Sequence, residues 1–315
     1  MESPYAKKLA ELFEVLRKSR GVTQEDFVHD VVSLRQYRRY LRGDSIMSYP
    51  VMVELSKRLS LTAKHVIEQL DKERLVEAKK VDNFYNALVT NDFEKARKLG
   101  DELFLDELYD DDNRLLYLHT LDLFKFLEKR ISKSEHLEHT LKLINYPSIL
   151  SKSIITPIEV LVLGALLRLH TPEERKKIAR FIDDLSQNDA FLYGYSNYHT
   201  VVLSMFALAR YYGFNGEYQK VLRVCDTSIE ICDRYKLLYL LPNFYYYRAL
   251  AYDFLDKDNL RDQALFQLFS ALYTENKPQR VKLFSKLLKK DFDIDFQAWV
   301  LEYMQNQFKL KGDFL

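Results

Sequence analysis

Arginine and glutamine side chains are concentrated in one short segment, residues 33–42 (SLRQYRRYLR). A guanidinium group can bond guanine at two atoms and a glutamine amide can bond adenine at two atoms, so this segment carries the chemistry for reading bases in a DNA groove. A helix over the segment would bury Leu34, Tyr37 and Leu41 along one stripe. The side chains then expected to face DNA are Ser33, Arg35, Gln36, Arg39 and Arg42, with Arg38 at the margin, where it packs or contacts the DNA backbone.

Five short helices are expected to position this segment within residues 1–70. Serine or threonine, which cap helix N-termini, precede four of them, and glycine follows two of them. The predicted helices span residues 6–18, 24–29, 33–42, 48–59 and 63–70. Such a series of short helices is typical of a compact helix-turn-helix domain. Thr23 and Gln24, at the start of the second helix, are placed to contact a DNA phosphate.

The rest of the chain is also predicted to be helical, which makes the fold all-α. Only 8 Gly and 7 Pro occur in 315 residues, and such scarcity favours long helices over sheets with many tight turns. The charged stretch DKERLVEAKK lacks Gly, Pro and Ser, so it is expected to be helical. We therefore predict a helix-turn-helix domain over residues 1–70, a helical linker over 71–82 and a repeat domain over 83–315.

Helical hairpins of similar length recur in the predicted repeat domain. Residues 83–103, 201–232 and 242–273 each read as a helix, a polar turn and a second helix. In the last two hairpins a small residue, Ala209 or Ala249, stands three positions before a tyrosine. This pattern resembles the tetratricopeptide repeat, whose hairpins stack into a solenoid with a concave binding surface.

Composition and motifs argue against several other classes of protein. The net charge is +1, so no overall basic field marks a nucleic-acid binder. His136 and His139 lie three residues apart but lack the further ligands of a metal site, and no phosphate-binding glycine loop or nucleophile motif occurs. We therefore expect no enzyme, no metal and no cofactor.

Cysteine usage and hydropathy indicate the cellular compartment. Cys225 and Cys232 lie seven residues apart on a predicted helix, about 10 Å along its axis, which is too far for a disulfide. Buried thiols of a reducing compartment are the expectation. The apolar run 154–169 is interrupted by charged residues and is too short to span a bilayer. The sequence therefore predicts a cytoplasmic protein without a membrane partner.

Both ends of the chain resemble one known group of regulators. The spacing of the capping and basic residues in the segment 23–43 resembles the Xre/Cro-type helix-turn-helix. Its register, together with the tetratricopeptide-like segment 217–255, is similar to the peptide-sensing Rgg/PlcR/PrgX group. This resemblance implies a cytoplasmic homodimer that binds a double-stranded DNA operator and is controlled, as in quorum sensing, by a short signalling peptide bound to the repeats.

The sequence departs from that group at two places. A glycine is usual in the turn before the recognition helix, and Asp30-Val31-Val32 stands here instead. Because Asp tolerates left-handed backbone geometry better than most residues, we expect the turn to persist. The group often has an asparagine in the first helix of a repeat that binds the peptide backbone, and the matching positions here are Ala207 and Tyr247.

The repeat register predicts which side chains line the concave surface. Asn243 can both donate to and accept from a peptide backbone, and Arg210 can hold a terminal carboxylate. The residues expected to bind a peptide are Asn197, Phe206, Arg210, Phe214, Asn243, Tyr246, Leu250 and Asp253.

Three functions remain open from the sequence. The first is a peptide-responsive transcription regulator. The second is a helix-turn-helix regulator whose repeats bind a protein partner. The third is a scaffold whose N-terminal domain only pairs two chains.

Overall fold

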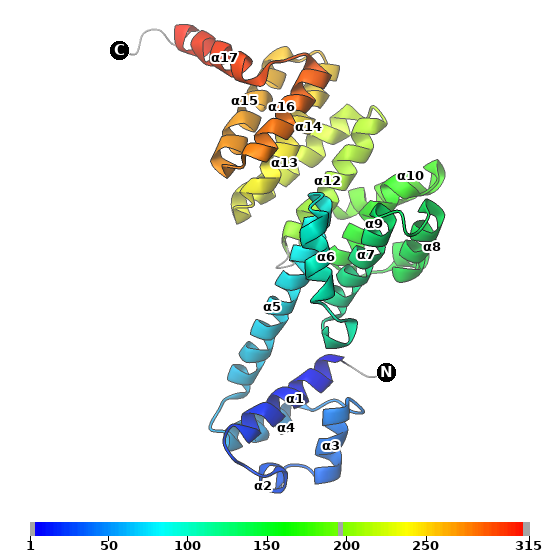
Figure 1. Ribbon diagram of the computed structural model, residues 1–315, viewed down its shortest axis with the longest axis vertical. Coiled ribbons are helices and arrows are strands. Elements are labelled where there is room, and N and C mark those ends of the chain that lie inside the picture. Colours follow the sequence, from blue (N-terminus) through cyan, green and yellow to red (C-terminus); the bar gives the residue numbers. More distant parts are fainter. Residues whose placement is uncertain (1–3, 195–197, 311–315) are drawn as a thin grey trace. The chain divides into compact units, whose positions relative to one another are not determined.

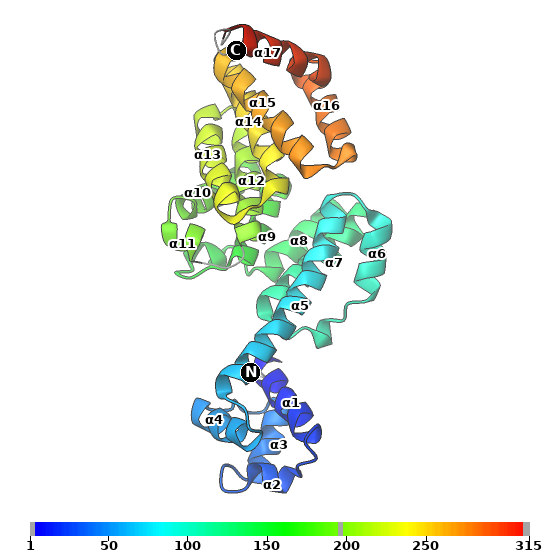
Figure 2. The same ribbon diagram turned by 90° about the vertical axis from the view of Figure 1, so that its left-hand side faces the viewer.

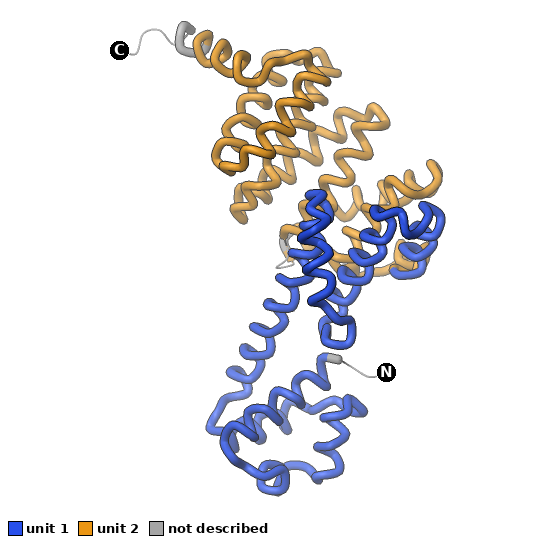
Figure 3. Tube along the Cα trace, viewed as in Figure 1, with its two compact units in different colours: residues 1–143 blue, residues 144–315 orange. Residues whose placement is uncertain are grey.

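The computed structural model describes residues 4–194 and 198–310, and within these ranges all regular structure is helical (Figure 1). This confirms the predicted all-α fold. The chain divides into two compact units, residues 1–143 and residues 144–315 (Figure 3). The first unit contains α1 (Pro4–Lys18), α2 (Gln24–Val28), α3 (Leu34–Arg42), α4 (Tyr49–Arg58), α5 (Ala63–Val89), α6 (Phe93–Asp101), η1 (Leu105–Glu107), α7 (Asp111–Leu127) and α8 (Lys133–Leu143).

Helices α2 to α5 begin where the capping residues predict, and α1 begins two residues before its predicted start at residue 6. The side chains of Thr23, Ser33 and Thr62 each accept a hydrogen bond from a backbone N–H of the first turn that follows. Ser48 occupies the corresponding position before α4, although its side chain makes no capping bond. Gly43 ends α3 in the left-handed conformation, at φ +80°. Local sequence chemistry therefore sets these helix boundaries.

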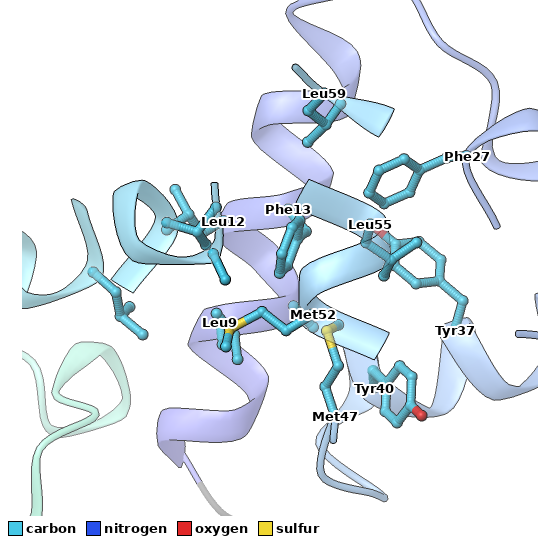
Figure 4. Close-up of a cluster of buried hydrophobic side chains, with 14 of the residues drawn as sticks. Leu9, Leu12, Phe13, Phe27, Tyr37, Tyr40, Met47, Met52, Leu55 and Leu59 are labelled. Carbon is cyan, nitrogen blue, oxygen red and sulfur yellow. The ribbon is translucent and has the colours of Figure 1, made fainter. Parts of the chain in front are cut away.

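A single apolar core joins α1 to α5. Figure 4 shows Phe13 of α1 among side chains from the other helices of this region. Phe27 of α2 packs against the Tyr37 ring in an edge-to-face arrangement, with ring centroids 5.6 Å apart. Tyr37 and Leu55 are completely buried. At about 25 cal/mol per Å² of apolar surface, each such side chain contributes on the order of 2 kcal/mol to the stability of the cluster.

The helix that begins at Ala63 runs through the charged stretch that was predicted to be helical. This confirms that residues 71–80 continue as helix, and α5 ends at Val89. Glu77, in this stretch, accepts hydrogen bonds from the backbone N–H of Tyr109 at 3.2 Å and from Asn113 Nδ2 at 2.8 Å. The Tyr109 hydroxyl donates to the Leu70 carbonyl at 2.9 Å. The predicted domain boundaries at residues 70 and 82 both fall inside α5 and stay predictions.

The second unit consists mainly of helical hairpins (Figure 2). The predicted hairpins over 201–232 and 242–273 are confirmed, because α12 packs on α13 and α14 packs on α15. Ala209 and Ala249 are fully buried where the paired helices approach. The elements of this unit are η2 (Ser148–Ser151), α9 (Pro157–Leu169), α10 (Pro172–Leu185), α11 (Asp189–Tyr193), α12 (Tyr198–Phe214), α13 (Tyr218–Tyr235), η3 (Leu238–Leu240), α14 (Leu241–Phe254), α15 (Asp258–Glu275), α16 (Pro278–Phe292) and α17 (Phe296–Leu310).

Both cysteines lie on α13 and are buried free thiols, as expected. Burial raises the pKa of both thiols, that of Cys232 to about 12. Thiols held in the protonated form are poor nucleophiles. Among the helices of the described ranges, none is long and apolar enough to cross a membrane.

Candidate nucleic-acid interface and ligand groove

Four arginines share the exposed face of α3. At 100° per residue, Arg35, Arg38, Arg39 and Arg42 fall within an arc of about 100°, on the side of the helix away from buried Tyr37. All four are exposed to solvent. Arg38, which the sequence placed at the margin, thus lies among the other three. The arrangement presents a basic helix face to the surroundings while the opposite face forms part of the domain core.

The polar side chains of α3 differ in the hydrogen bonds and ion pairs that they make within the protein. Within the described ranges, Arg35 and Arg38 have no hydrogen bond or ion pair. Arg42 Nε lies 2.8 Å from an Asp44 carboxylate oxygen, an exposed ion pair of small net strength. Gln36 donates to Ser45 Oγ at 2.9 Å and accepts from an Arg39 guanidinium nitrogen at 3.3 Å. Arg35 and Arg38 are therefore the two arginines free to bind a ligand without first breaking an internal bond.

Ser33, Thr23 and Gln24 serve as structural anchors in this structure. The Ser33 side chain caps α3. The Thr23 hydroxyl caps α2 and donates to an Asp26 carboxylate oxygen at 2.7 Å. Gln24 Nε2 donates to Glu14 Oε1 at 3.2 Å. Their predicted contacts with DNA stay predictions, and each would require its side chain to share or exchange these bonds.

Glu14 of α1 connects three helices, which the sequence did not reveal. It accepts hydrogen bonds from Arg17 Nε at 3.0 Å, from the Tyr37 hydroxyl of α3 at 3.1 Å and from Gln24 of α2. The bond from Arg17 is the main cause that lowers the pKa of Glu14. The spacing of Glu14 and Arg17 was the only sequence signal, because the partners on α2 and α3 are far away in the chain. This carboxylate fixes α3, and with it the arginine face, against α1.

The turn between α2 and α3 is held by backbone geometry and by a second arginine. Asp30 adopts φ +56°, so the left-handed conformation expected of this residue is confirmed. The Arg58 guanidinium, from α4, donates to the backbone carbonyls of Asp26 and His29 at the end of α2. These bonds satisfy carbonyls that a helix end leaves without partners. Arg58 is therefore a positioning residue that sequence reasoning missed.

A second candidate site lies where α9, α12 and α14 pack side by side in the second unit. The predicted residues Phe206, Arg210 and Phe214 follow one another at intervals of four on one face of α12. The Phe206 ring meets that of Tyr247, on α14, edge to face at 5.6 Å. The Arg210 guanidinium lies 5.5 Å from the centre of the Phe214 ring, which is 77% exposed. Aromatic surface and positive charge thus meet at this place.

The other predicted ligand residues are less available or lie elsewhere. Tyr246 is buried and its hydroxyl donates to Asp291. Asn243 Oδ1 accepts from Arg280 at 3.4 Å, and Asp253 pairs with Arg261 at 3.0 Å. Leu250 is half-buried, and Asn197 lies outside the described residues. Their roles stay predictions.

The departures from the peptide-sensing pattern have structural consequences. Ala207 packs against Gly164 of α9 so closely that a methyl group on Gly164 would lie 3.2 Å from the Ala207 methyl group. Small residues thus let α9 and α12 approach each other. Tyr247 faces Phe206, and its charge environment includes both Arg168 and Arg210. An aromatic hydroxyl therefore stands near the two arginines, at the position where the sequence pattern has an asparagine.

The histidine pair contacts a carboxylate on a neighbouring helix. His136 and His139 each bond the carboxylate of Asp122 through Nδ1, His139 at 2.6 Å. In the part of the chain that the structure describes, no cluster of three or more metal-ligating side chains occurs. The pair instead joins α8 to α7.

The comparison with solved structures identifies the fold. No family model matches the sequence, and no curated protein matches it. Among solved structures, the chain is similar to Bacillus thuringiensis PlcR in complex with the peptide PapR7 and DNA, with a TM-score of 0.59 and 15% identity over 90% of this chain and 99% of that chain. It is also similar to the competence regulator ComR from Streptococcus vestibularis in complex with its signaling peptide XIP (TM-score 0.53, 14% identity, 92% and 99% covered).

A third similar structure is ComR from S. thermophilus in complex with DNA and its signalling peptide ComS, with a TM-score of 0.51 and 15% identity over 93% of this chain and 99% of that chain. At these identities the likeness establishes the fold. The chain therefore has, along nearly its whole length, the all-α fold of PlcR and ComR, with a helix-turn-helix region followed by helical repeats.

Proposed function

We propose that this chain is a sequence-specific DNA-binding transcription regulator controlled by a short signalling peptide. The observation that carries the proposal is the exposed face of α3 with its four arginines, backed by a buried core. An α-helix fits the major groove, and arginine is the side chain that most often reads guanine there. The protein would act as a cytoplasmic homodimer, because the DNA sites of helix-turn-helix proteins usually consist of two paired half-sites. It would have no catalytic activity.

The local structure supports rigid presentation of this face. Tyr37 is fully buried, Glu14 binds its hydroxyl, and Arg58 holds the turn that precedes α3. Because these contacts hold the buried side of α3 in place, the helix loses little conformational freedom when it binds DNA. Arg35 and Arg38 add two cations with no internal partner in the described ranges, so binding to DNA costs them no ion pair. These contacts favour a DNA interface over a surface that only pairs two chains.

Peptide control is supported by the second unit. Phe206, Arg210 and Tyr247 combine apolar and polar recognition groups where three helices pack. The similar structures of PlcR and ComR were solved with peptides bound, two of them together with DNA. The shared fold and the combination of aromatic and charged side chains at this place favour a peptide over a protein partner, which stays the alternative.

DNA binding is tested by selecting bound fragments from a genomic DNA library and measuring affinity for the enriched site. Arg35→Ala and Arg38→Ala should each weaken binding by about 1–3 kcal/mol if these side chains read bases or bind phosphates. Arg180→Ala, an exposed arginine of α10, is the matched control and should leave the affinity unchanged. Unchanged affinity in both α3 variants would refute the assignment of this helix.

Peptide control is tested with synthetic peptides encoded by small reading frames beside the gene. Calorimetry on the full chain should detect binding by one of them, and its addition should change affinity for the selected DNA site. Binding of a neighbouring gene's protein product, with no response to any peptide, would favour the alternative of a protein partner.

A further inference from the structure

Two arginines on neighbouring helices of the second unit lie within reach of each other's charge. Gly164 of α9 packs against Ala207 of α12. Arg168 and Arg210 follow these two contact residues by about one helical turn, so they lie on the adjoining faces of the two helices. Arg168 is exposed to solvent at its surface, and its pKa is lowered first by partial desolvation and then by the positive charge of Arg210. The two guanidinium groups are therefore close enough to repel each other.

Neither arginine has a counter-charge within the described residues. Arg210 Nε is buried and has no hydrogen-bond partner, and no ion pair involves Arg168 or Arg210. The nearest interaction of Arg210 is with the Phe214 ring. A buried donor without a partner costs free energy, and two like charges side by side add to that cost. An anion between the two guanidinium groups would remove both penalties.

Tyr247 completes the set of donors. Its charge environment includes both Arg210 and Arg168, and burial raises the pKa of its hydroxyl, which keeps this group a hydrogen-bond donor. Asp291 also acts on Tyr247, but the Asp291 carboxylate accepts the hydroxyl of Tyr246. No ion pair in the described ranges joins an acidic side chain to Arg168 or Arg210, so the two positive charges outnumber the Asp291 carboxylate that acts on Tyr247.

We propose that Arg168, Arg210 and the Tyr247 hydroxyl bind a carboxylate group of the peptide ligand, an inference that rests on the proposed peptide-sensing function. Guanidinium groups hold carboxylates with paired hydrogen bonds, which fixes the orientation of the ligand as well as its charge. The rings of Phe206 and Phe214 flank the arginine of α12 and supply apolar surface for neighbouring side chains. The carboxylate comes from the C-terminus of the peptide or from an Asp or Glu side chain.

Three pools of random heptapeptides distinguish these sources. One has free C-terminal carboxylates but lacks Asp and Glu, the second has C-terminal amides and contains Asp and Glu, and the third has amides and lacks both acids. Each pool is mixed with the full chain, and retained peptides are counted by mass spectrometry after gel filtration. Retention of the first or second pool, but not the third, is expected and identifies the carboxylate.

Variants test the residues. Arg168→Gln and Arg210→Gln should each reduce retention at least about tenfold, because each removes a charge-assisted bond. Arg180→Gln, whose side chain lies exposed on α10, should retain peptides like the wild type. Retention by both groove variants at the wild-type level would overturn the proposal. If a variant fails to fold, as circular dichroism would show, the comparison of pools on the wild-type chain still decides.

The experiment distinguishes failure of the carboxylate site from failure of the proposed peptide control. Retention of the third pool as strongly as the other two would overturn the carboxylate site and leave peptide sensing intact. Retention of no pool would contradict the carboxylate site together with the proposed peptide control, while the DNA-binding test on α3 would be unaffected.

Discussion

Replacing Glu14 with alanine should loosen α3 without touching any residue that faces DNA. The change removes the acceptor of the buried Tyr37 hydroxyl and the bonds from Arg17 and Gln24. Arg17 keeps a second acceptor, the Val22 carbonyl, and it remains a neighbour of the Tyr37 oxygen, so the O–H donor of Tyr37 is the main group left unpaired. An unsatisfied buried group costs about 1–3 kcal/mol, and the lost ionic bonds bring the expected total to about 2–3 kcal/mol.

Native-state hydrogen exchange measures this effect locally. Each 1.36 kcal/mol is tenfold in an opening equilibrium, so amides of α3 should exchange roughly 30- to 150-fold faster in Glu14→Ala. Glu11→Ala, on the same helix and without a described side-chain bond, is the control and should leave the rate unchanged. Equal exchange in the Glu14 variant and the wild type would refute the reasoning that this carboxylate holds α3.

The Glu14 carboxylate should also make the stability of α3 depend on pH. Its pKa in the folded chain is lowered from the ordinary 4.5, chiefly by the bond from Arg17. The folded state therefore binds a proton less readily than the unfolded state, so the stabilisation is complete above pH 4.5 and is lost as the pH falls toward the folded pKa. Protection of α3 in the wild type should decline below pH 4.5, and Glu14→Gln should show a smaller decline. Parallel curves would contradict this account.

Three further changes test other parts of the structure. Gly43→Ala places a Cβ at φ +80° and should destabilise the end of α3 by about 1–2 kcal/mol, read as faster exchange there; an unchanged rate would contradict it. Burial lowers the pKa of His119 to about 4, so stability should fall as the pH drops from 6.5 toward 4. His119→Leu should remove about 3 kcal/mol of that fall in urea unfolding, and identical pH profiles would disprove it. Arg210→Met should raise the thermal midpoint by about 2 °C by removing an unpaired buried donor, and a lower midpoint would argue that the arginine has a partner.

The sequence predicted those features that depend on neighbours within one or two helical turns. Ser33 caps α3 and Gly43 ends it because capping needs only the residues of one turn. Tyr37 is buried as the apolar spacing indicated. The left-handed conformation of Asp30 is also a local property, because its short polar side chain lets this residue adopt positive φ at a low energetic cost.

Features that join distant segments escaped prediction. Glu14 binds α2 and α3 only after both helices have docked, so no local spacing encodes these bonds. On α14 the repeat register predicted Tyr246, whose role stays a prediction, while the structure brings the neighbouring Tyr247 against Phe206. Tyr246 and Tyr247 differ by 100° around the helix, which is enough to send one hydroxyl to Asp291 and to leave the other in the charge field of the arginines. A shift of one residue in the register therefore changes which tyrosine lies near the arginines.

Arg35 and Arg38 of the first unit and Arg210 of the second unit differ in how much free energy of folding is lost because they have no partner among the described residues. On α3, water solvates Arg35 and Arg38, so their charges are available to DNA at little cost in stability. At Arg210 the Nε atom is shielded from solvent and has no partner among the described residues, and the nearby charge of Arg168 adds to the cost. A ligand carboxylate that satisfies both groups would therefore stabilise the packing of α9 on α12 as well as occupy the groove. Peptide binding shifts the equilibrium between two conformations of the repeats only if one conformation, with the two arginines close together, binds the carboxylate more tightly than the other. Peptide control depends on this difference in affinity.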